Sequence, residues 1–158
     1  MLHKLLLAAL SITFSALTPV VLAARSVEQF EVSVTIPTLE FYVLPVDPRV
    51  MEQDQRLDWN LATLKLSTLR ADFDVKNTNG GISARLTERA YLQGEFGEID
   101  LNVKFNNIQL SLNTQPVVND ARAGRRVPLE IAAVEPPKGY KAGDYYGTVH
   151  ILFEAVSP

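Results

Sequence analysis

The side chains that could support acid–base or metal chemistry are few and scattered along this chain. The sequence of 158 residues contains no cysteine and two histidines, His3 and His150. His150 alternates with the apolar Val149 and Ile151, so the pattern places it on the solvent face of a strand. Without thiolates or a neighbouring second histidine, the usual ligands of zinc and other transition metals are missing. We therefore expect no metal or other cofactor.

Two pairs of carboxylates have a spacing that acid–base catalysis can use. Asp72 and Asp74 form the first pair, and Glu98 and Asp100 form the second. Residues two apart lie on the same face of a strand, so each pair can act on one substrate in principle. Both pairs are interleaved with apolar residues such as Phe73, which assigns the acids to the polar, solvated face. The sequence thus predicts that the protein is not an enzyme.

The N-terminal residues have the organisation of a secretory signal peptide. Residues 1–4 are short and basic, and residues 5–22 are apolar, with Pro19 near their end. Small residues at Val21 and Ala23 predict cleavage after Ala23, with Ala24 as the second choice. An uncleaved membrane anchor is the alternative, but Pro19 and the small residues favour cleavage. We expect an exported protein whose first compartment is the bacterial periplasm.

Removal of residues 1–23 leaves a chain of one domain's length. The sequence carries 15 Lys and Arg against 18 Asp and Glu, and the signal holds one of the lysines, so the mature net charge is −4 (14 − 18). A mildly acidic chain without a polybasic run argues against nucleic acid as a partner.

A strand-like segment follows directly on the signal peptide. Phe30, Val32, Val34 and Ile36 alternate with polar residues, and Pro37 ends the pattern, because proline cannot donate a ladder hydrogen bond. Two interpretations are open. The segment is either an ordinary first strand of its own domain or a strand that the chain donates to another molecule.

The rest of the chain repeats short alternating segments, which predicts an all-β sandwich. Helical turns are expected at most in residues 49–56 and 88–97, and Trp59 is expected in the core. Positive-φ residues predict turns at residues 77–81 and 106–107. The expected strands are marked by apolar residues at positions 39, 41 and 43; 57, 59 and 61; 73 and 75; 82, 84 and 86; 99, 101, 103 and 105; 108, 110 and 112; 127, 129, 131 and 133; and 149, 151, 153 and 155.

In this order the segments resemble the subunits of alternate chaperone–usher fimbriae, the alpha clade typified by colonisation factor antigen I pilins. The resemblance is carried by residues 27–37, by the hairpins in 75–86 and 101–112, and by residues 142–149, Ala-Gly-Asp-Tyr-Tyr-Gly-Thr-Val. The last of these is similar to the Gly-x-Tyr-x-Gly sequence that commonly leads into the final strand of fimbrial subunits. Ile36-Pro37 replaces the family's usual Asp-Pro, which shifts the expected boundary of the first segment by a residue or two.

The resemblance implies an incomplete immunoglobulin-like β-sandwich that lacks its last strand. The expected domains are a signal peptide (1–23), an N-terminal donor-strand extension (24–37) and a pilin domain (38–158). The donor side chains would be Phe30, Val32, Val34 and Ile36. The acceptor groove would be lined by Leu39, Phe41, Val149, Ile151 and Phe153.

The resemblance also implies a function and a set of partners. The protein would be a structural subunit, most simply the shaft pilin, of a fimbria that polymerises by donor-strand complementation and supports surface adhesion. Its partners would be copies of itself or related pilins, a periplasmic chaperone, an outer-membrane usher and a tip adhesin. It would pass through the periplasm to the cell-surface fimbria. The alternative is a monomeric exported β-sandwich that binds a carbohydrate or another small ligand.

Overall fold

The computed structural model describes residues 40–157. These residues belong to one compact unit, Thr35–Pro158. The predicted signal peptide and the expected donor residues, Phe30, Val32, Val34 and Ile36, lie outside the described residues, as does Leu39 of the expected groove.

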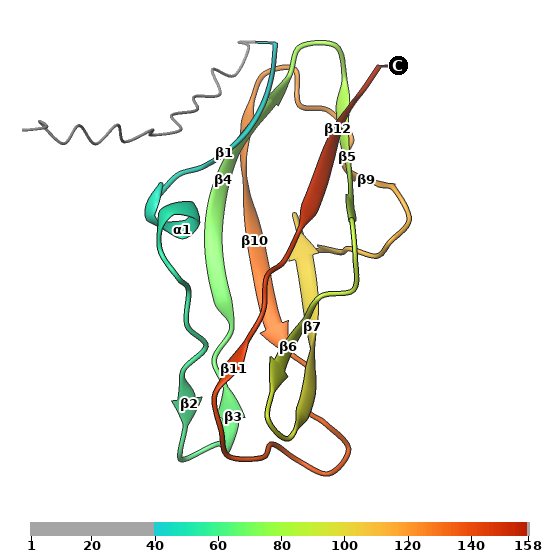
Figure 1. Cartoon of the computed structure of the whole chain (residues 1–158). Helices are drawn as coiled ribbons and strands as arrows, with labels where there is room; N and C mark the ends of the chain where they lie inside the picture. The colour runs from blue at the N-terminus through green and yellow to red at the C-terminus, as the bar shows by residue number, and fades with distance from the viewer. Residues whose placement is uncertain (1–39, 158) are drawn as a thin grey trace, which may run out of the picture. The chain divides into compact units, whose positions relative to one another are not determined.

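The larger of two facing sheets is antiparallel and is built from strands far apart in the sequence (Figure 1). Its order is β1 (Phe41–Pro45), β4 (Leu69–Asn77), β10 (Arg125–Ala133), β7 (Gly97–Phe105), β6 (Tyr91–Gly94) and β11 (Tyr145–Tyr146), and β8 (Ile108–Gln109) also pairs with β7. The central strands carry alternating apolar and polar residues, so one face of this sheet is apolar.

The second sheet has the order β12 (Ile151–Val156), β5 (Gly81–Leu86) and β9 (Gln115–Val118). A separate small hairpin pairs β2 (Trp59–Asn60) with β3 (Lys65–Leu66), and the short helix α1 (Arg49–Glu52) follows β1. The helical turn expected in residues 49–56 is therefore confirmed at its start. Within the described part of the chain, no helix has the length and apolar character needed to cross a membrane.

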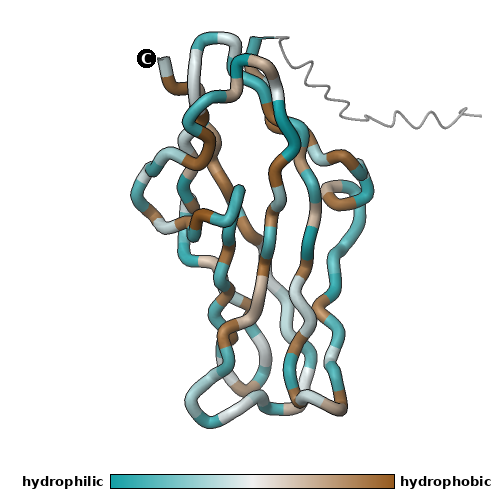
Figure 2. Tube along the Cα trace, turned by 180° about the vertical axis from the view of Figure 1, so that it is seen from behind, coloured by the Kyte–Doolittle hydropathy of each residue, from teal (hydrophilic) through white to brown (hydrophobic). Residues whose placement is uncertain are grey.

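The core lies between the two sheets and is continuous. Apolar and polar residues alternate along the strands (Figure 2), and the inward-facing apolar residues of the central strands, such as Phe73, Val103 and Phe105, are buried, as the sequence predicted. Phe105 of β7 contacts Phe73 of β4 with ring centroids 5.8 Å apart and Phe153 of β12 at 4.7 Å. Tilted and edge-on aromatic pairs of this kind stabilise beyond their buried area. This row of three rings joins β12 to the larger sheet.

The predicted turns are confirmed. Residues 78–80 connect β4 to β5, and Asn106 and Asn107 connect β7 to β8 with φ of 51° and 63°. Asparagine tolerates this left-handed conformation better than most residues.

Three expectations about local structure are wrong. Residues 88–97 contain strand β6 instead of a helical turn. Trp59 was expected in the core but is 43% exposed, with its ring edge-on to Tyr140 at 5.4 Å. Leu112 lies beyond the two residues of β8 and is 57% exposed, so the strand expected there ends early.

Candidate functional site

The strand order shows which position of the sandwich the described residues leave open. An immunoglobulin-type domain has strands A-B-E-D in one sheet and C-F-G in the other. Here β1, β4, β10 and β7 take the places of A, B, E and D, while β5 and β12 take those of C and F. Among residues 40–157 no strand pairs with the outer edge of β12, which is the place of strand G.

The backbone of β12 alternates between its two edges. The Thr87 N–H donates to the His150 carbonyl at 3.1 Å, so the backbone groups of His150 face β5. Because N–H and C=O groups point to alternate sides along a strand, those of the even-numbered residues face β5 and those of Ile151, Phe153 and Ala155 face the free edge. The backbone N–H and C=O groups at the free edge therefore come from Ile151, Phe153 and Ala155, whose side chains lie on the core-facing side of β12.

The edges of β1 and β9 carry protective features that β12 lacks. Val46 N–H donates to the Asp72 carbonyl at 2.8 Å, which by the same alternation turns the backbone of Pro45 in β1 outward. Pro116 in β9 opposes Ser83 beside a register irregularity, and its backbone also faces outward. Proline and bulges block further strand pairing. The free edge of β12 contains no proline, so it is better suited to accept a strand than the edges of β1 and β9.

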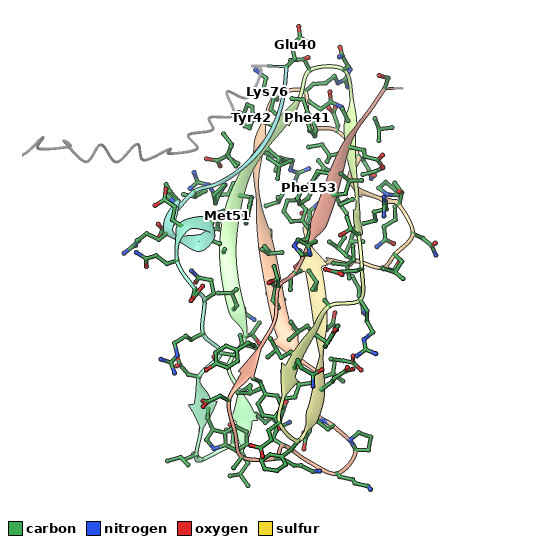
Figure 3. All side chains as sticks on the ribbon, in the orientation of Figure 1. Glu40, Phe41, Tyr42, Met51, Lys76 and Phe153 are labelled. Atoms are coloured by element: carbon green, nitrogen blue, oxygen red, sulfur yellow. The ribbon has the colours of Figure 1, made fainter. Side chains whose placement is uncertain are left out.

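Four of the five residues predicted to line the acceptor groove lie in the described part of the chain. Phe41 is on β1, Ile151 and Phe153 are on β12, and Val149 lies two residues before β12. All four are partly buried and pack against the core cluster. Phe41 and Phe153 extend from strands of opposite sheets into the interior (Figure 3). These four residues therefore lie on β1, on β12 and on the segment that leads directly into β12.

Asn77 is a residue at this site that sequence reasoning treated only as a turn former. Asn77 is buried, with only 1% of its surface exposed. The Nδ2 group donates to the Gly81 carbonyl at 2.6 Å and to the Val156 carbonyl at 3.0 Å. The side chain thus ties the β4–β5 turn to the end of β12. Its signal in the sequence was indistinguishable from that of any Asn before a Gly-containing turn.

Glycine and tyrosine residues explain how the chain reaches β12. β11 pairs with β6 in the larger sheet, and four residues later β12 pairs with β5 in the other sheet. The crossing point is Gly147, where a Cβ would collide with the carbonyl oxygen of Tyr91. Tyr145 covers Gly94, where a Cβ would meet its ring, and its hydroxyl donates to the Lys141 carbonyl at 3.1 Å. The sequence Gly-x-Tyr-x-Gly therefore permits a close crossing between the sheets.

Three of the four acidic residues considered for catalysis are engaged in surface ion pairs. The Arg126 guanidinium donates to both carboxylate oxygens of Asp74, at 2.9 and 3.0 Å, and these hydrogen bonds hold the pKa of Asp74 below its usual value. Arg89 pairs with both Glu98 and Asp100. Asp74, Glu98 and Asp100 are each matched by an arginine.

His150 is paired in the same way. Its Nδ1 lies 2.5 Å from the Glu88 carboxylate, and both side chains are more than half exposed. Among the described residues no group of three or more His, Cys, Asp or Glu side chains is arranged to hold a metal ion.

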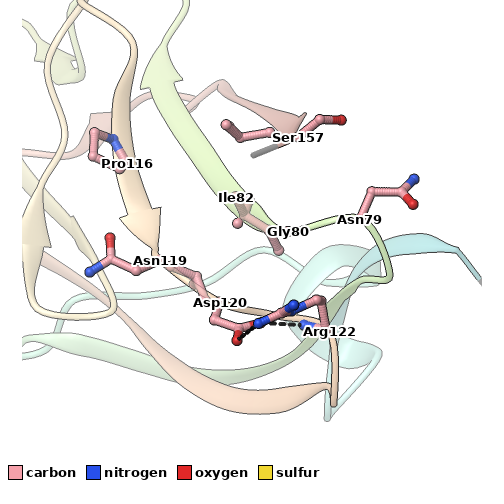
Figure 4. Close-up of a pocket in the computed structure, with 11 residues that line it drawn as sticks. Asn79, Gly80, Ile82, Pro116, Asn119, Asp120, Arg122 and Ser157 are labelled. Carbon is pink, nitrogen blue, oxygen red and sulfur yellow. Dashed lines mark hydrogen bonds and ion pairs between the residues drawn. The ribbon is translucent and has the colours of Figure 1, made fainter.

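A hollow lies at the end of the sandwich that carries the β4–β5 turn (Figure 4). It has a volume of about 270 Å³ and is bounded by the β4–β5 turn, the loop after β9 and the end of β12. Asp120 and Arg122 form a bidentate pair on its wall, with the closest approach at 2.7 Å. That pair holds the pKa of Asp120 at about 2.

Together, the strand order and the unprotected edge define an immunoglobulin-like, all-β domain of the pilin class. A structural comparison agrees, since the fold is similar to that of the CooA pilin subunit from enterotoxigenic Escherichia coli. The TM-score is 0.53 and the sequence identity is 17%, over 62% of this chain and 75% of that chain. The family model for the CS1 type fimbrial major subunit matches residues 26–154, and the chain belongs to that family. No curated protein sequence matches the chain.

Membership in this family settles the broad role that the sequence predicted. The protein is a structural pilin subunit, polymerises with other pilin subunits and resides in a cell-surface fimbria. A structural family also agrees with the expectation that the protein is not an enzyme. The alternative of a monomeric, ligand-binding sandwich is not favoured by these findings.

Proposed function

We propose that this subunit polymerises by donor-strand complementation, with residues 27–36 of a neighbouring copy forming the missing strand beside β12. The observation that carries the proposal is the free edge of β12. Within residues 40–157 this edge has no proline and no strand paired with it, and the side chains of Val149, Ile151 and Phe153 beside it are only partly buried against the core. The segment that follows the predicted signal peptide has matching alternation.

The pairing direction and register follow from the fold. Strand G of an immunoglobulin-type sheet runs antiparallel to strand F, so the donated segment begins beside the end of β12 and finishes near Val149. The acceptor strand has four inward positions two residues apart, at Val149, Ile151, Phe153 and Ala155. The donor segment has four with the same spacing, at Phe30, Val32, Val34 and Ile36. Full overlap places Phe30 opposite Ala155 and Ile36 opposite Val149. The largest donor side chain then meets the smallest acceptor side chain.

The energy of such a joint is substantial. Burial of Phe30, Val32, Val34 and Ile36 contributes about 1.5–3 kcal/mol for each side chain, or about 6–12 kcal/mol before ordering costs. The backbone groups of Ile151, Phe153 and Ala155 would also gain partners. Reversal requires removal of a strand from a folded core, so the joint should be long-lived.

The same edge explains a need for assembly factors. An unprotected edge with apolar side chains beside it promotes aggregation of free subunits. A periplasmic chaperone would cover the edge after cleavage of the signal peptide, and an outer-membrane usher would exchange that chaperone for the next subunit's segment. The family match begins at residue 26, shortly after the predicted cleavage site at Ala23, which supports this division of the chain. We further propose that the subunit forms the fimbrial shaft, beneath a separate tip adhesin.

The experiment is a matched pair of substitutions in the full chain, expressed with its own chaperone and usher genes. Val34→Asp places a charge on the face expected to enter the core, whereas Thr35→Asp places the same charge on the opposite face. Burial of an unpaired carboxylate costs several kcal/mol, enough to abolish the joint. We expect SDS-resistant polymers and surface fibres from Thr35→Asp and neither from Val34→Asp, with both monomers reaching the periplasm.

Normal SDS-resistant polymers from the Val34→Asp chain would overturn the proposal. Equal loss of polymers in both variants would also contradict the proposal. A charge would then block polymerisation equally on either face of the donor segment, whereas the proposal buries only one face.

A further inference from the structure

The proposed joint leaves very little chain between two neighbouring subunits. In the register above, Ile36 of the donating subunit lies beside Val149 of the accepting subunit. Only Pro37, Thr38 and Leu39 separate Ile36 from Glu40, where the described domain of the donating subunit begins. Four extended residue steps span at most about 14 Å. The two domains must therefore touch near the point where the donated strand ends.

The accepting subunit exposes aromatic and apolar side chains close to that point. Tyr146 lies three residues before Val149, at most about 11 Å away along the chain, and it is 74% exposed. The loop that leads into β11 contacts the β2–β3 hairpin through Tyr140 and Trp59. That hairpin carries Leu61 and Leu64, which are 82% and 61% exposed. We call the surface formed by the exposed residues Tyr146, Leu61 and Leu64 the β11 end.

The donating subunit presents a different surface, formed by Glu40, the β4–β5 turn and Arg122, which we call the Glu40 end. The Thr78 N–H donates to the Glu40 carbonyl at 2.8 Å, so the β4–β5 turn lies beside the start of the domain. The next residues of the turn, Asn79 and Gly80, line the 270 Å³ hollow whose wall carries Arg122 (Figure 4). Arg122 is hydrogen-bonded in its plane to Asp120, which leaves the guanidinium faces available for stacking on an aromatic ring.

We infer that the β11 end is a second contact surface of each subunit, occupied by the Glu40 end of the subunit that donates its strand, with Tyr146 as the central residue. The flat ring of tyrosine suits stacking on the guanidinium face of Arg122 at the wall of the hollow. The two surfaces differ, so the contact is heterologous and continues along a fibre instead of closing into a dimer. The inference rests on the proposed donor strand and adds a contact between domains, which would determine the stiffness of the shaft.

The test uses assembled fibres and separates this contact from the donor-strand joint. Tyr146→Ala and Arg122→Ala are compared with Tyr146→Phe and with the control Leu112→Ala, which removes an exposed side chain from the loop before β9. SDS-resistant polymers report the donor strand. The persistence length in electron micrographs, and the force at which single fibres extend, report the contact between domains.

We expect normal SDS-resistant polymers from all four variants. Tyr146→Ala and Arg122→Ala should each give thin, flexible fibres that extend at lower force, and the double variant should lose little more than either single one. Tyr146→Phe and Leu112→Ala should resemble the unmodified fibre. Unchanged stiffness in Tyr146→Ala would overturn the inference and leave the donor strand intact. Loss of SDS-resistant polymers in Tyr146→Ala would also overturn it, because Tyr146 would then act in the joint itself.

Discussion

Replacement of Asn77 tests whether the end of β12 is held in place by a single buried amide. The Nδ2 group bridges the carbonyls of Gly81 and Val156, and Oδ1 accepts a hydrogen bond from the Asn79 N–H at 3.1 Å. These three bonds connect the β4–β5 turn with the last residues of β12. A loss of this connection should loosen the strand that accepts the donor segment.

The magnitude follows from the bonds that are lost. Asn77→Ala removes three hydrogen bonds at a buried position, each worth about 0.5–1.5 kcal/mol, so the free energy of unfolding should fall by about 1.5–4.5 kcal/mol. Asn77→Asp keeps the acceptor but places a carboxylate against two carbonyl oxygens, so at neutral pH it should destabilise at least as much. Asn79→Ala is the control, because its exposed side chain makes no hydrogen bond within the described residues.

Urea unfolding of the purified subunit, followed by circular dichroism, measures the effect. With a slope of about 1–3 kcal/mol per molar urea, Asn77→Ala should lower the midpoint by roughly 0.5 M or more, while Asn79→Ala should lie close to the unmodified subunit. Asn77→Asp should regain part of its stability at acidic pH, where the carboxyl is protonated. An Asn77→Ala subunit within about 0.5 kcal/mol of the unmodified one would refute the reasoning.

Two further predictions concern the strand crossing and the pair on the hollow's wall. Gly147→Ala should lower the free energy of unfolding by about 1–3 kcal/mol, because the new Cβ meets the Tyr91 carbonyl, and an unchanged melting temperature would contradict this. The pKa of Asp120 is held near 2, below the ordinary 3.8, by hydrogen bonds from Arg122. A depressed pKa stabilises the fold above the ordinary value, so this contribution should disappear between about pH 4 and pH 2. Titration by carboxyl NMR should show the pKa rising toward 3.8 in 1 M salt or in Arg122→Gln, and a pKa near 3.8 in the unmodified protein at low salt would refute it.

The long strands could be predicted from the sequence because their burial alternates. β7 has apolar residues at Ile99, Leu101, Val103 and Phe105, and three of these four are buried while Leu101 packs against the core. A strand with one face toward the core must repeat its apolar residues every second position. The same rule identified Val149, Ile151 and Phe153 as one inward face.

The wrong predictions involve short elements whose partners decide their structure. β6 has only four residues, and its own sequence does not predict a strand. It forms a strand because it pairs with its neighbours in the larger sheet. Trp59 alternates with Leu57 and Leu61, yet its two-residue strand belongs to a hairpin outside the two main sheets. Local alternation cannot distinguish such a hairpin from a core strand. The role of Asn77 required the three-dimensional proximity of residues 79 positions apart.

The positions of the prolines favour strand addition at β12 over the edges of β1 and β9. Pro45 and Pro116 each occupy a backbone position that faces away from the paired neighbour, so neither costs a hydrogen bond within its own sheet, and both remove a donor from the free edge. In the proposed register the backbone of Pro37 faces away from β12, because the even-numbered donor residues pair with it. Pro37 therefore ends the donated strand without weakening the joint. A segment inserted in the opposite phase would turn Pro37 toward β12 and Phe30 toward solvent, which explains why one phase of this strand should be strongly preferred.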